Sequence, residues 1–265
     1  MHTRELFSLA DRVAIVTGGR GLYGASISRG LAEMGATVVA ASRNGQACED
    51  FAAELRKENA KAIGLTLDLG NDASIQSFVK EVICRYGHID ILVNNAVDRR
   101  NMTSLTAATR QKLQDSASVN LNGQILLSQA VLEHMIPANH GSIIFISSMR
   151  GLDCPHFPFY PPAMQAQPVN YTTEKWAMIG LTKYMAGCYG KHHIRVNCIA
   201  PGGYDPGLSD DPEKKEFVNT YIQNCPLGCW ANEDDIKGPV VFLASEASRY
   251  VTGATLVMDG GWTIW

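Results

Sequence analysis

The chain has 265 residues, of which 46% are hydrophobic and 24 are glycine, a composition typical of a globular protein with a sizeable core. Its net charge of -3 is too small to gather nucleic acid or an anionic membrane surface, so small molecules are the expected partners. The seven scattered cysteines do not resemble a disulfide framework, and no apolar run suits a signal peptide or a membrane span. We therefore expect a soluble, cytoplasmic protein.

Short runs of β-branched and apolar residues recur along the chain and predict buried strands. They cover residues 13–17, 37–41, 62–67, 89–94, 142–146, 194–200 and 255–258. Stretches with helical spacing of apolar residues lie between them, such as the stretch with Ile75, Phe78 and Val82. Because parallel strands need crossover connections, this alternation predicts one doubly wound α/β domain over residues 1–265. Its parallel sheet should have about seven strands, with helices on both faces.

Two segments interrupt the alternation and predict loops beside a ligand. Residues 153–168 hold five prolines, and residues 202–227 hold several aspartates. We expect these segments to form the two walls of a substrate pocket. Within the second, Asp211-Pro212 predicts the start of a short helix, with the aspartate as N-cap and the proline at the first helical position.

The first predicted strand ends in a glycine-rich turn that is followed by an apolar helical stretch. Glycines let a backbone turn sharply and approach a pyrophosphate, which the free N–H groups of a helix N-terminus then stabilise. The alternative is a tight turn that binds nothing, but the position between strand and helix favours a dinucleotide site. The predicted cofactor contacts in this turn are Gly18, Arg20, Gly21, Leu22, Tyr23 and Gly24.

Further cofactor contacts are expected where other strands end, since the carboxyl ends of parallel strands meet at one edge of the sheet. Asp68, followed by Leu69, closes the third strand and can accept a hydrogen bond from the adenine amino group. Asn95 and Ala96 close the fourth strand and can lie beside the adenosine ribose.

The end of the second strand favours NADP(H) over NAD(H). A site for NAD usually has a carboxylate there, but this strand leads into Ser42-Arg43, and no carboxylate occurs before Glu49. Arg43 can therefore bind a 2′-phosphate, with Ser42 adding a hydroxyl and Arg20 a second cation. In the alternative interpretation, Arg43 stacks on the adenine and accepts either cofactor.

A tyrosine and a lysine begin the helical stretch after the proline-rich segment. Tyr171 and Lys175 are four residues apart and so share one helix face. Phenols are poor acids and bases at neutral pH, but a nearby ammonium favours the phenolate, which makes the pair suitable for proton transfer. The alternative is an ordinary amphipathic helix with a surface lysine. Ser148, which follows the preceding strand, can bring a hydroxyl to the same substrate oxygen.

Other chemistries lack their motifs. There is no GxSxG sequence for a serine hydrolase, the seven histidines form no HExxH pattern, and Cys225 and Cys229 have no second pair for zinc. We therefore predict no metal site.

Five motifs together resemble the short-chain dehydrogenase/reductase family. They are the glycine turn, Asn94-Asn95-Ala96, Ser147-Ser148, the Tyr171 and Lys175 pair, and Pro201-Gly202 after Arg195-Val196-Asn197. The resemblance spans roughly residues 12–261 and implies a Rossmann fold that usually assembles as a homotetramer. It also implies that Asn120 holds a water on a proton relay behind Lys175, and that Pro201 and Gly202 contact the cofactor.

The chain departs from the family pattern in three places. Leu22 stands where many members have a glycine, so that the turn reads TGxxGxxG, and Val97 replaces the glycine of NNAG. Ser148 also lies 23 residues before Tyr171, about ten more than is usual in the family. The catalytic groups are retained, but a reshaped pocket is expected.

The resemblance implies reversible hydride transfer between a nicotinamide cofactor and a secondary alcohol or ketone. Two other functions stay open, a nucleotide-sugar epimerase or dehydratase and a nucleotide-binding regulator without turnover. Polar residues near the site favour a sugar, polyol or sugar acid, whereas aromatic residues of the insertion suit an apolar ketone. The polar residues are Gln165, Gln167 and Asn170, and the aromatic ones are Phe157, Phe159 and Tyr160.

Overall fold

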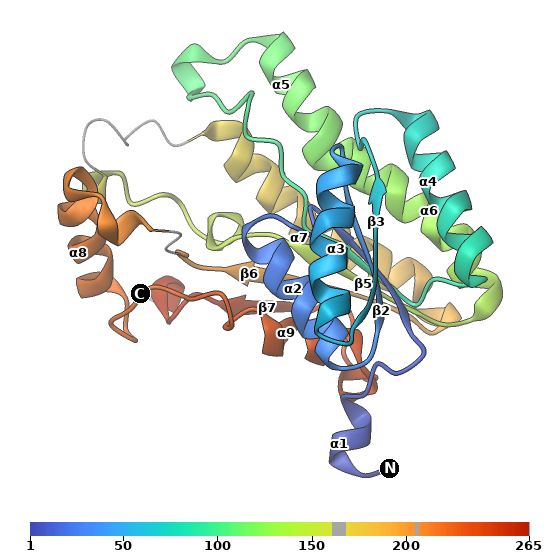
Figure 1. Ribbon diagram of the computed structural model, residues 1–265. Coiled ribbons are helices and arrows are strands. Elements are labelled where there is room, and N and C mark those ends of the chain that lie inside the picture. Colours follow the sequence, from blue (N-terminus) through green and yellow to red (C-terminus); the bar gives the residue numbers. More distant parts are fainter. Residues whose placement is uncertain (161–167, 205–206, 265) are drawn as a thin grey trace.

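The computed structural model of the chain describes residues 1–160, 168–204 and 207–264. Its centre is a parallel sheet of seven strands, as the sequence predicted, and the strands lie in the order β3-β2-β1-β4-β5-β6-β7 (Figure 1). The strands are β1 (Val13–Thr17), β2 (Thr37–Ser42), β3 (Lys61–Thr66), β4 (Ile91–Asn94), β5 (Gly141–Ile146), β6 (Ile194–Pro201) and β7 (Thr255–Met258).

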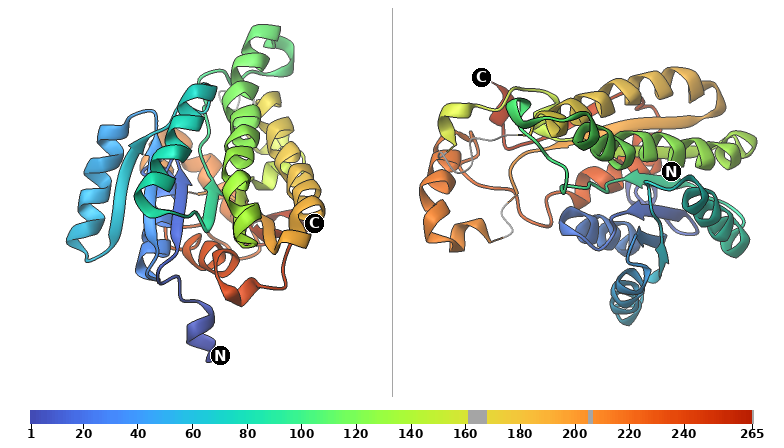
Figure 2. Two further views of the ribbon diagram at one scale, coloured as in Figure 1. Left: turned by 90° about the vertical axis from the view of Figure 1, so that its right-hand side faces the viewer. Right: turned by 90° about the horizontal axis from the view of Figure 1, so that it is seen from above.

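Helices lie on both faces of this sheet (Figure 2). The helices are α1 (Thr3–Leu6), α2 (Leu22–Glu33), α3 (Gly45–Lys57), α4 (Asp72–Tyr86), α5 (Arg110–Ala117), α6 (Gly123–Ala138), α7 (Val169–Tyr189), α8 (Lys215–Asn224) and α9 (Lys237–Ala244). A single π-helical turn, η2 (Ser118–Asn122), joins α5 to α6. None of the described helices is long and apolar enough to cross a membrane.

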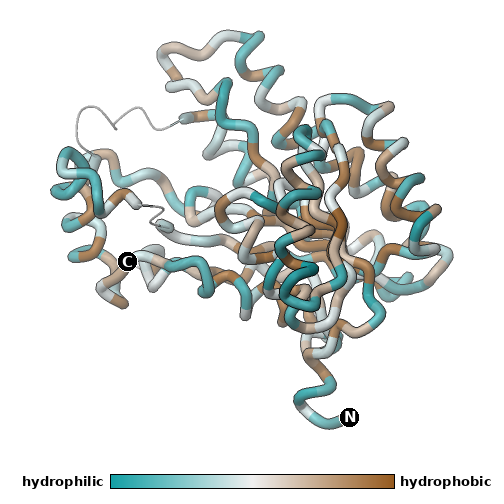
Figure 3. Tube along the Cα trace, viewed as in Figure 1, coloured by the Kyte–Doolittle hydropathy of each residue, from teal (hydrophilic) through white to brown (hydrophobic). Residues whose placement is uncertain are grey.

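Successive residues of β1 pack into two separate cores, which explains the continuous apolar strands. Ile15 packs in the core formed with α4, α6 and α7, whereas Val16 packs in the core formed with α2, α3 and α9. Figure 3 shows the hydrophobic residues concentrated along the strands and on the inner sides of the helices. The central strands are therefore buried on both faces.

The order of the strands places a binding crevice at the carboxyl end of the sheet. From β1 the chain first builds outward through β2 and β3, and it then returns to place β4 on the other side of β1. The connections after β1 and β4 therefore diverge and leave a crevice between them. The glycine turn follows β1, and the Asn95-Ala96 pair follows β4, so both predicted cofactor segments border this crevice.

The second predicted loop contains the helix start that its sequence indicated. Asp211 caps a short 3₁₀ turn, Pro212–Lys214, by accepting a hydrogen bond from the Glu213 N–H at 3.0 Å. Pro212 occupies the first position of this turn, and α8 continues from it.

Candidate active site

The glycine turn after β1 leaves the N-terminus of α2 open to a ligand. Gly18 has a φ of +63°, a conformation that favours glycine. A Cβ on Gly24 would lie 2.0 Å from the Gly18 carbonyl oxygen, so this close approach also requires glycine. Gly21 is the N-cap of α2 and supplies no side-chain hydrogen bond to the helix. The first N–H groups of α2 can therefore bind an anion.

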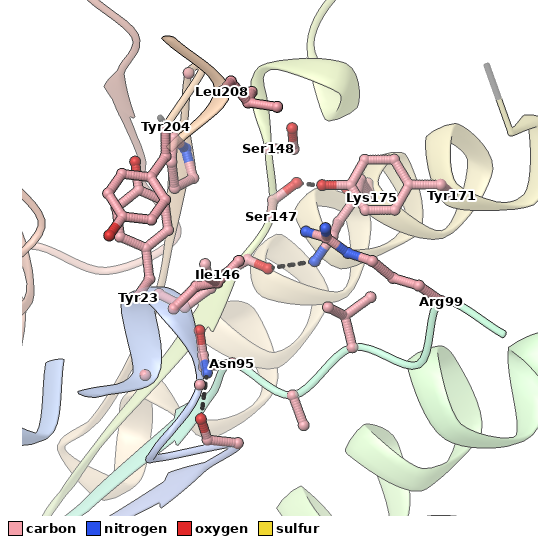
Figure 4. A pocket seen from close by; sticks show the side chains of 18 residues that line it. Tyr23, Asn95, Arg99, Ile146, Ser147, Ser148, Tyr171, Lys175, Tyr204 and Leu208 are labelled. Carbon is pink, nitrogen blue, oxygen red and sulfur yellow. Dashed lines mark hydrogen bonds between the residues drawn. The ribbon is translucent and has the colours of Figure 1, made fainter. Parts of the chain in front are cut away.

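A cavity of about 550 Å³ adjoins this turn at the carboxyl end of the sheet (Figure 4). Predicted site residues line much of it: Gly18, Gly21, Leu22, Tyr23, Gly24, Asn95, Ala96, Ser148, Tyr171, Lys175, Pro201 and Gly202. Residues that the sequence did not single out as contacts complete the wall: Val97, Arg99, Ile146, Ser147, Tyr204 and Leu208. The segments predicted to bind the cofactor and to carry the catalytic groups thus meet in one cavity.

A smaller cavity of about 150 Å³ lies on the other side of the glycine turn, beside β2 and β3. The predicted adenosine contacts Ser42, Arg43, Asp68, Leu69 and Ala96 line it. Its position at the ends of β2 and β3 suits the adenosine half of a dinucleotide, and we call it the adenosine cavity. The larger cavity suits the nicotinamide half.

Arg20 differs from the other predicted contacts because it lines neither cavity. Its charge lies close enough to Cys48 of α3 to oppose the rise in the pKa of that thiol, which burial causes. Arg20 is thus near the adenosine cavity but outside its wall.

Tyr171 and Lys175 both project from the first turns of α7 into the larger cavity. Lys175 is buried, its Nζ donates a hydrogen bond to the Ile146 carbonyl oxygen at 2.7 Å, and it lies 5.6 Å from the centre of the Tyr171 ring. The end of β5 therefore fixes the ammonium beside the Tyr171 ring in the same cavity. This arrangement suits proton transfer at Tyr171.

The two serines after β5 have different hydrogen bonds. Ser147 Oγ donates to the Lys175 carbonyl oxygen at 2.8 Å, so its only proton is engaged by the backbone of α7. Ser148 Oγ instead accepts from the Arg150 N–H at 3.2 Å and has no described acceptor for its own proton. Ser148 can therefore donate to a substrate oxygen, and Ser147 supports the position of Lys175.

Asn120 lies in the π turn η2 and is held on several sides. Its Oδ1 accepts from the Asp98 N–H at 2.6 Å, and its Nδ2 donates to the Asp98 carbonyl oxygen at 2.9 Å. The side chain therefore ties the π turn to the loop after β4. Asn120 does not line the larger cavity, so any role that it has in catalysis is indirect.

A charged cluster beside the adenosine cavity was not predicted. The buried Asp98 carboxylate forms a salt bridge with Arg100 and a longer one, at 3.7 Å, with Arg43. Hydrogen bonds from Arg100 are the main cause that lowers the pKa of Asp98. Asp98 directly follows the family's NNAG position, but its partner Arg43 lies 55 residues earlier in the chain. No local sequence pattern therefore indicates this pair.

Tyr23, in the first turn of α2, contacts a second tyrosine at the larger cavity. Its ring centre lies 4.7 Å from that of Tyr204, and the two rings pack together on the same side of the larger cavity (Figure 4). The Tyr23 hydroxyl has no hydrogen-bond partner among the described residues. Burial, followed by the charge of Asp235, raises the pKa of Tyr23, so the phenol stays neutral. The pair forms an aromatic wall opposite the segment that bears Tyr171.

The two predicted substrate segments are placed differently. Tyr204 and Leu208 of the second segment line the larger cavity. In the first segment, Tyr160 stacks on Phe217 of α8, and none of residues 153–160 lines this cavity. Residues 161–167, including the predicted polar contacts Gln165 and Gln167, lie outside the described part of the chain.

Asn170 corrects one sequence-based interpretation, because its side chain is not available to a substrate. Its Oδ1 accepts from the Thr103 N–H at 3.0 Å, while its Nδ2 donates to the Asn101 carbonyl oxygen and to Ser116 Oγ. The residue is buried and joins α7 to α5. Its neighbour Tyr171 faces the cavity, and side chains one position apart on a helix point in different directions.

Comparisons with known proteins agree with this geometry. A family model described as enoyl-(acyl carrier protein) reductase matches residues 20–263. The chain is 32% identical to gluconate 5-dehydrogenase of Gluconobacter oxydans, over 100% of this chain and 99% of that protein. It is 34% identical to 2-dehydro-3-deoxy-D-gluconate 5-dehydrogenase of Pseudoalteromonas atlantica, over 97% and 98%. The chain belongs to the short-chain dehydrogenase/reductase family.

Solved structures of short-chain dehydrogenases/reductases share the fold over the whole chain. A gluconate 5-dehydrogenase from Burkholderia cenocepacia, in complex with NADP and tartrate, has a TM-score of 0.88 and 34% identity, and each chain is covered to 100%. In the present dehydrogenase/reductase, both departures from the family's glycine pattern, Leu22 and Val97, line the larger cavity. The departures therefore change the wall of the site itself.

Proposed function

We propose that this dehydrogenase/reductase transfers a hydride reversibly between NADP(H) and a secondary hydroxyl of a sugar acid. The observation that carries the substrate class is Arg99, which reaches from the loop after β4 into the cavity that holds Tyr171 (Figure 4). Its guanidinium has no hydrogen bond or ion pair within the described residues. A planar cation with free donors at a catalytic cavity suits a substrate carboxylate.

The residues of the cavity fit a nicotinamide dinucleotide. Gly21 faces open space, since only the Gly18 carbonyl oxygen, at 3.5 Å, would contact an added Cβ, and the N-terminus of α2 can hold the pyrophosphate. When bound, the nicotinamide accepts the hydride from an alcohol or donates one to a ketone. The chain supplies binding, orientation and proton transfer.

During alcohol oxidation, the Tyr171 phenolate removes the hydroxyl proton while the hydride leaves the carbon. Lys175 favours the phenolate through its charge, and Ser148 donates a hydrogen bond to the substrate oxygen. In the reverse direction, Tyr171 gives its proton to the carbonyl oxygen. The names of the relatives, which include gluconate 5-dehydrogenase and D-threitol dehydrogenase, support this chemistry on sugar acids and polyols.

The function is tested by following the absorbance of reduced nicotinamide with matched substrates. D-Gluconate and D-glucitol have the same carbon number, but only gluconate carries a carboxylate. We expect turnover of sugar acids, and a fall of at least about a hundredfold in Tyr171→Phe with little change in NADP binding. Lys175→Ala should weaken both turnover and NADP binding. Near-normal turnover in Tyr171→Phe, or no turnover of any hydroxy acid or polyol by the wild type, would overturn the proposal.

The role of Arg99 has its own test in the same assay. Arg99→Gln should raise KM for the sugar acid about tenfold or more, since a hydrogen bond to a charged group contributes about 1.5 kcal/mol or more. KM of the variant for a polyol substrate should stay within about twofold of the wild-type value. A polyol has no carboxylate, so the substitution removes no charged hydrogen bond to it. Equal changes for both substrates would contradict the assignment of the carboxylate to Arg99.

We also propose that NADP(H) is the preferred cofactor. Arg43 lines the adenosine cavity, its side chain is 51% exposed, and its long ion pair with Asp98 leaves it able to turn toward a 2′-phosphate. Two related gluconate 5-dehydrogenase structures, from Burkholderia cenocepacia and Beutenbergia cavernae, contain NADP. In the alternative arrangement, Arg43 stacks on the adenine and either cofactor is accepted.

We further propose that the enzyme forms a homo-oligomer in the cytoplasm. Trp176 and Tyr184 on α7 are 52% and 68% exposed, and Leu113 on the neighbouring α5 is 40% exposed. Large apolar side chains grouped on adjacent helices favour burial against a second copy. All seven cysteines are unpaired, which suits a reducing compartment. Sedimentation of the purified protein should give a mass above that of one chain, and Trp176→Glu should reduce it.

A further inference from the structure

Glu174 is a buried carboxylate between the two catalytic candidates on α7, and the mechanism above does not use it. Its side chain is directed to the junction of α5 and the π turn and does not line the larger cavity. There Oε1 accepts a hydrogen bond from Ser116 Oγ at 2.7 Å, and Oε2 accepts one from Asn120 Nδ2 at 2.9 Å. The carboxylate therefore joins the end of α5 to the middle of the π turn.

The directions of the neighbouring hydrogen bonds favour the ionised form of Glu174. Ser116 Oγ accepts from Asn170 Nδ2 at 2.8 Å, and its one proton goes to Glu174. The two hydrogens of Asn120 Nδ2 have the Asp98 carbonyl oxygen and Glu174 as their nearest acceptors, both at 2.9 Å. The longer contact of this amide with Ser116, at 3.2 Å, can only share one of these hydrogens. Asn120 Oδ1 accepts from the Asp98 N–H, which turns Nδ2 toward Glu174. A proton on Glu174 would face the Ser116 hydroxyl and the Asn120 amide, both of which already donate to the carboxylate.

Ionisation of Glu174 has a cost, and the charge of Lys175 offsets part of it. Burial raises the pKa of Glu174, against the opposing effects of the hydrogen bonds from Ser116 and Asn120 and of the charge of Lys175. Lys175 on the same helix is the charged group that acts on it. The Asp98 carboxylate, from the loop after β4, is bound to Arg43 and Arg100 instead. Ser116 and Asn120, which face Glu174 from α5 and the π turn, do not titrate.

We propose that Glu174 is a positioning residue for the reaction, holding Asn120 in place and setting the charge balance of the Tyr171 and Lys175 pair. This inference rests on the oxidoreductase function proposed above. A negative charge three residues after Tyr171 and next to Lys175 in the chain makes it harder for either group to lose a proton.

The test compares Glu174→Gln with the wild type in the pH dependence of kcat for alcohol oxidation. The amide has the same shape but no charge, and its N–H₂ group would face the Asn120 donor. We expect the acid limb of the profile to move to lower pH by about half a unit or more. The plateau kcat should fall severalfold while the Kd for NADPH, measured by fluorescence, stays within about twofold.

Asp90→Asn is the matched control, because Asp90 is also 7% exposed but lies at the amino end of β4, opposite the site. Its carboxylate accepts from the Val13 N–H at 2.8 Å. This variant should lose thermal stability without moving the pH profile. If Glu174→Gln does not fold, Glu174→Ala serves instead, since it removes the same charge and leaves room for water to take up the two hydrogen bonds.

A second measurement separates this inference from the proposed function. The near-ultraviolet absorbance of the phenolate is titrated in the free protein, and the Tyr171→Phe spectrum is subtracted to isolate one tyrosine. Loss of the Glu174 charge should move this titration to lower pH whether or not the substrate class is right. Unchanged titration and unchanged pH profile in the Glu174 variants would overturn the positioning role, whereas a wild type without turnover would overturn the function alone.

Discussion

Arg43, at the end of β2, is the residue on which the choice between the two cofactors should depend. Arg43 lines the adenosine cavity, and the chain has no carboxylate between the end of β2 and Glu49, where a site for NAD usually has one. We expect Arg43→Ala to lower kcat/KM for NADP by about tenfold or more, because a charge-assisted contact to phosphate is lost. The value for NAD should change much less, and steady-state kinetics with both cofactors measures the ratio.

Arg20→Ala is the matched control for this prediction. Both arginines lie near the adenosine cavity, but Arg20 is outside its wall. Its removal should weaken NADP use less than removal of Arg43, since only long-range attraction is lost. A wild type that prefers NAD, or an equal effect of the two substitutions, would show that the 2′-phosphate is bound elsewhere.

The turn between β1 and α2 contains two glycines that should respond differently to the same substitution. A Cβ on Gly24 would lie 2.0 Å from the Gly18 carbonyl oxygen, whereas one on Gly21 would meet nothing closer than 3.5 Å. Gly24→Ala should therefore lower the free energy of unfolding by about 1–3 kcal/mol through overpacking. Gly21→Ala should cost less than about 1 kcal/mol but weaken cofactor binding severalfold, because its methyl group enters the cavity.

Urea unfolding and cofactor titration of the two variants check this prediction. The informative result is the contrast between them, since one substitution acts on the packing of the turn and the other on the space for the ligand. A Gly21→Ala protein that binds NADPH as tightly as the wild type would mean that the pyrophosphate does not approach the start of α2.

At the scale of the whole molecule, a charged cluster at the amino ends of the strands makes stability depend on pH. Arg12 donates to His140 Nε2 at 2.9 Å and forms a salt bridge with Asp90 at 3.0 Å. Burial, followed by the charge of Arg12, lowers the pKa of His140 below its ordinary value. The folded protein thus takes up this proton at lower pH than the unfolded chain does, and stability is lost as the pH falls below about 6.5.

His140→Gln should remove this part of the pH dependence, because the amide oxygen can still accept from Arg12 but does not titrate. Urea unfolding at pH 7 and at pH 5 should show a larger loss of stability in the wild type than in the variant. Equal losses in the two proteins would mean that His140 is protonated as easily in the folded state as in the unfolded one.

Local patterns in the sequence were enough to determine the fold and the main site segments. The strands, the glycine turn and the Asp211 cap each depend on residues that are neighbours in the chain, and a parallel sheet brings the ends of its strands together. Tyr171 and Lys175 could be paired because four residues make about one helical turn. The order of the motifs along the chain then indicated the family and its type of reaction.

Only the tertiary structure decided which polar side chains face the ligand and which support the site. Asn170 was expected at the substrate, but it binds Ser116, 54 residues earlier, and Glu174 reaches the same serine across 58 residues. Arg99 and Arg20 are both exposed arginines in loops after strands, yet only Arg99 lines a cavity. Such roles depend on the direction of a side chain and on partners from distant segments, and periodicity in the sequence contains neither.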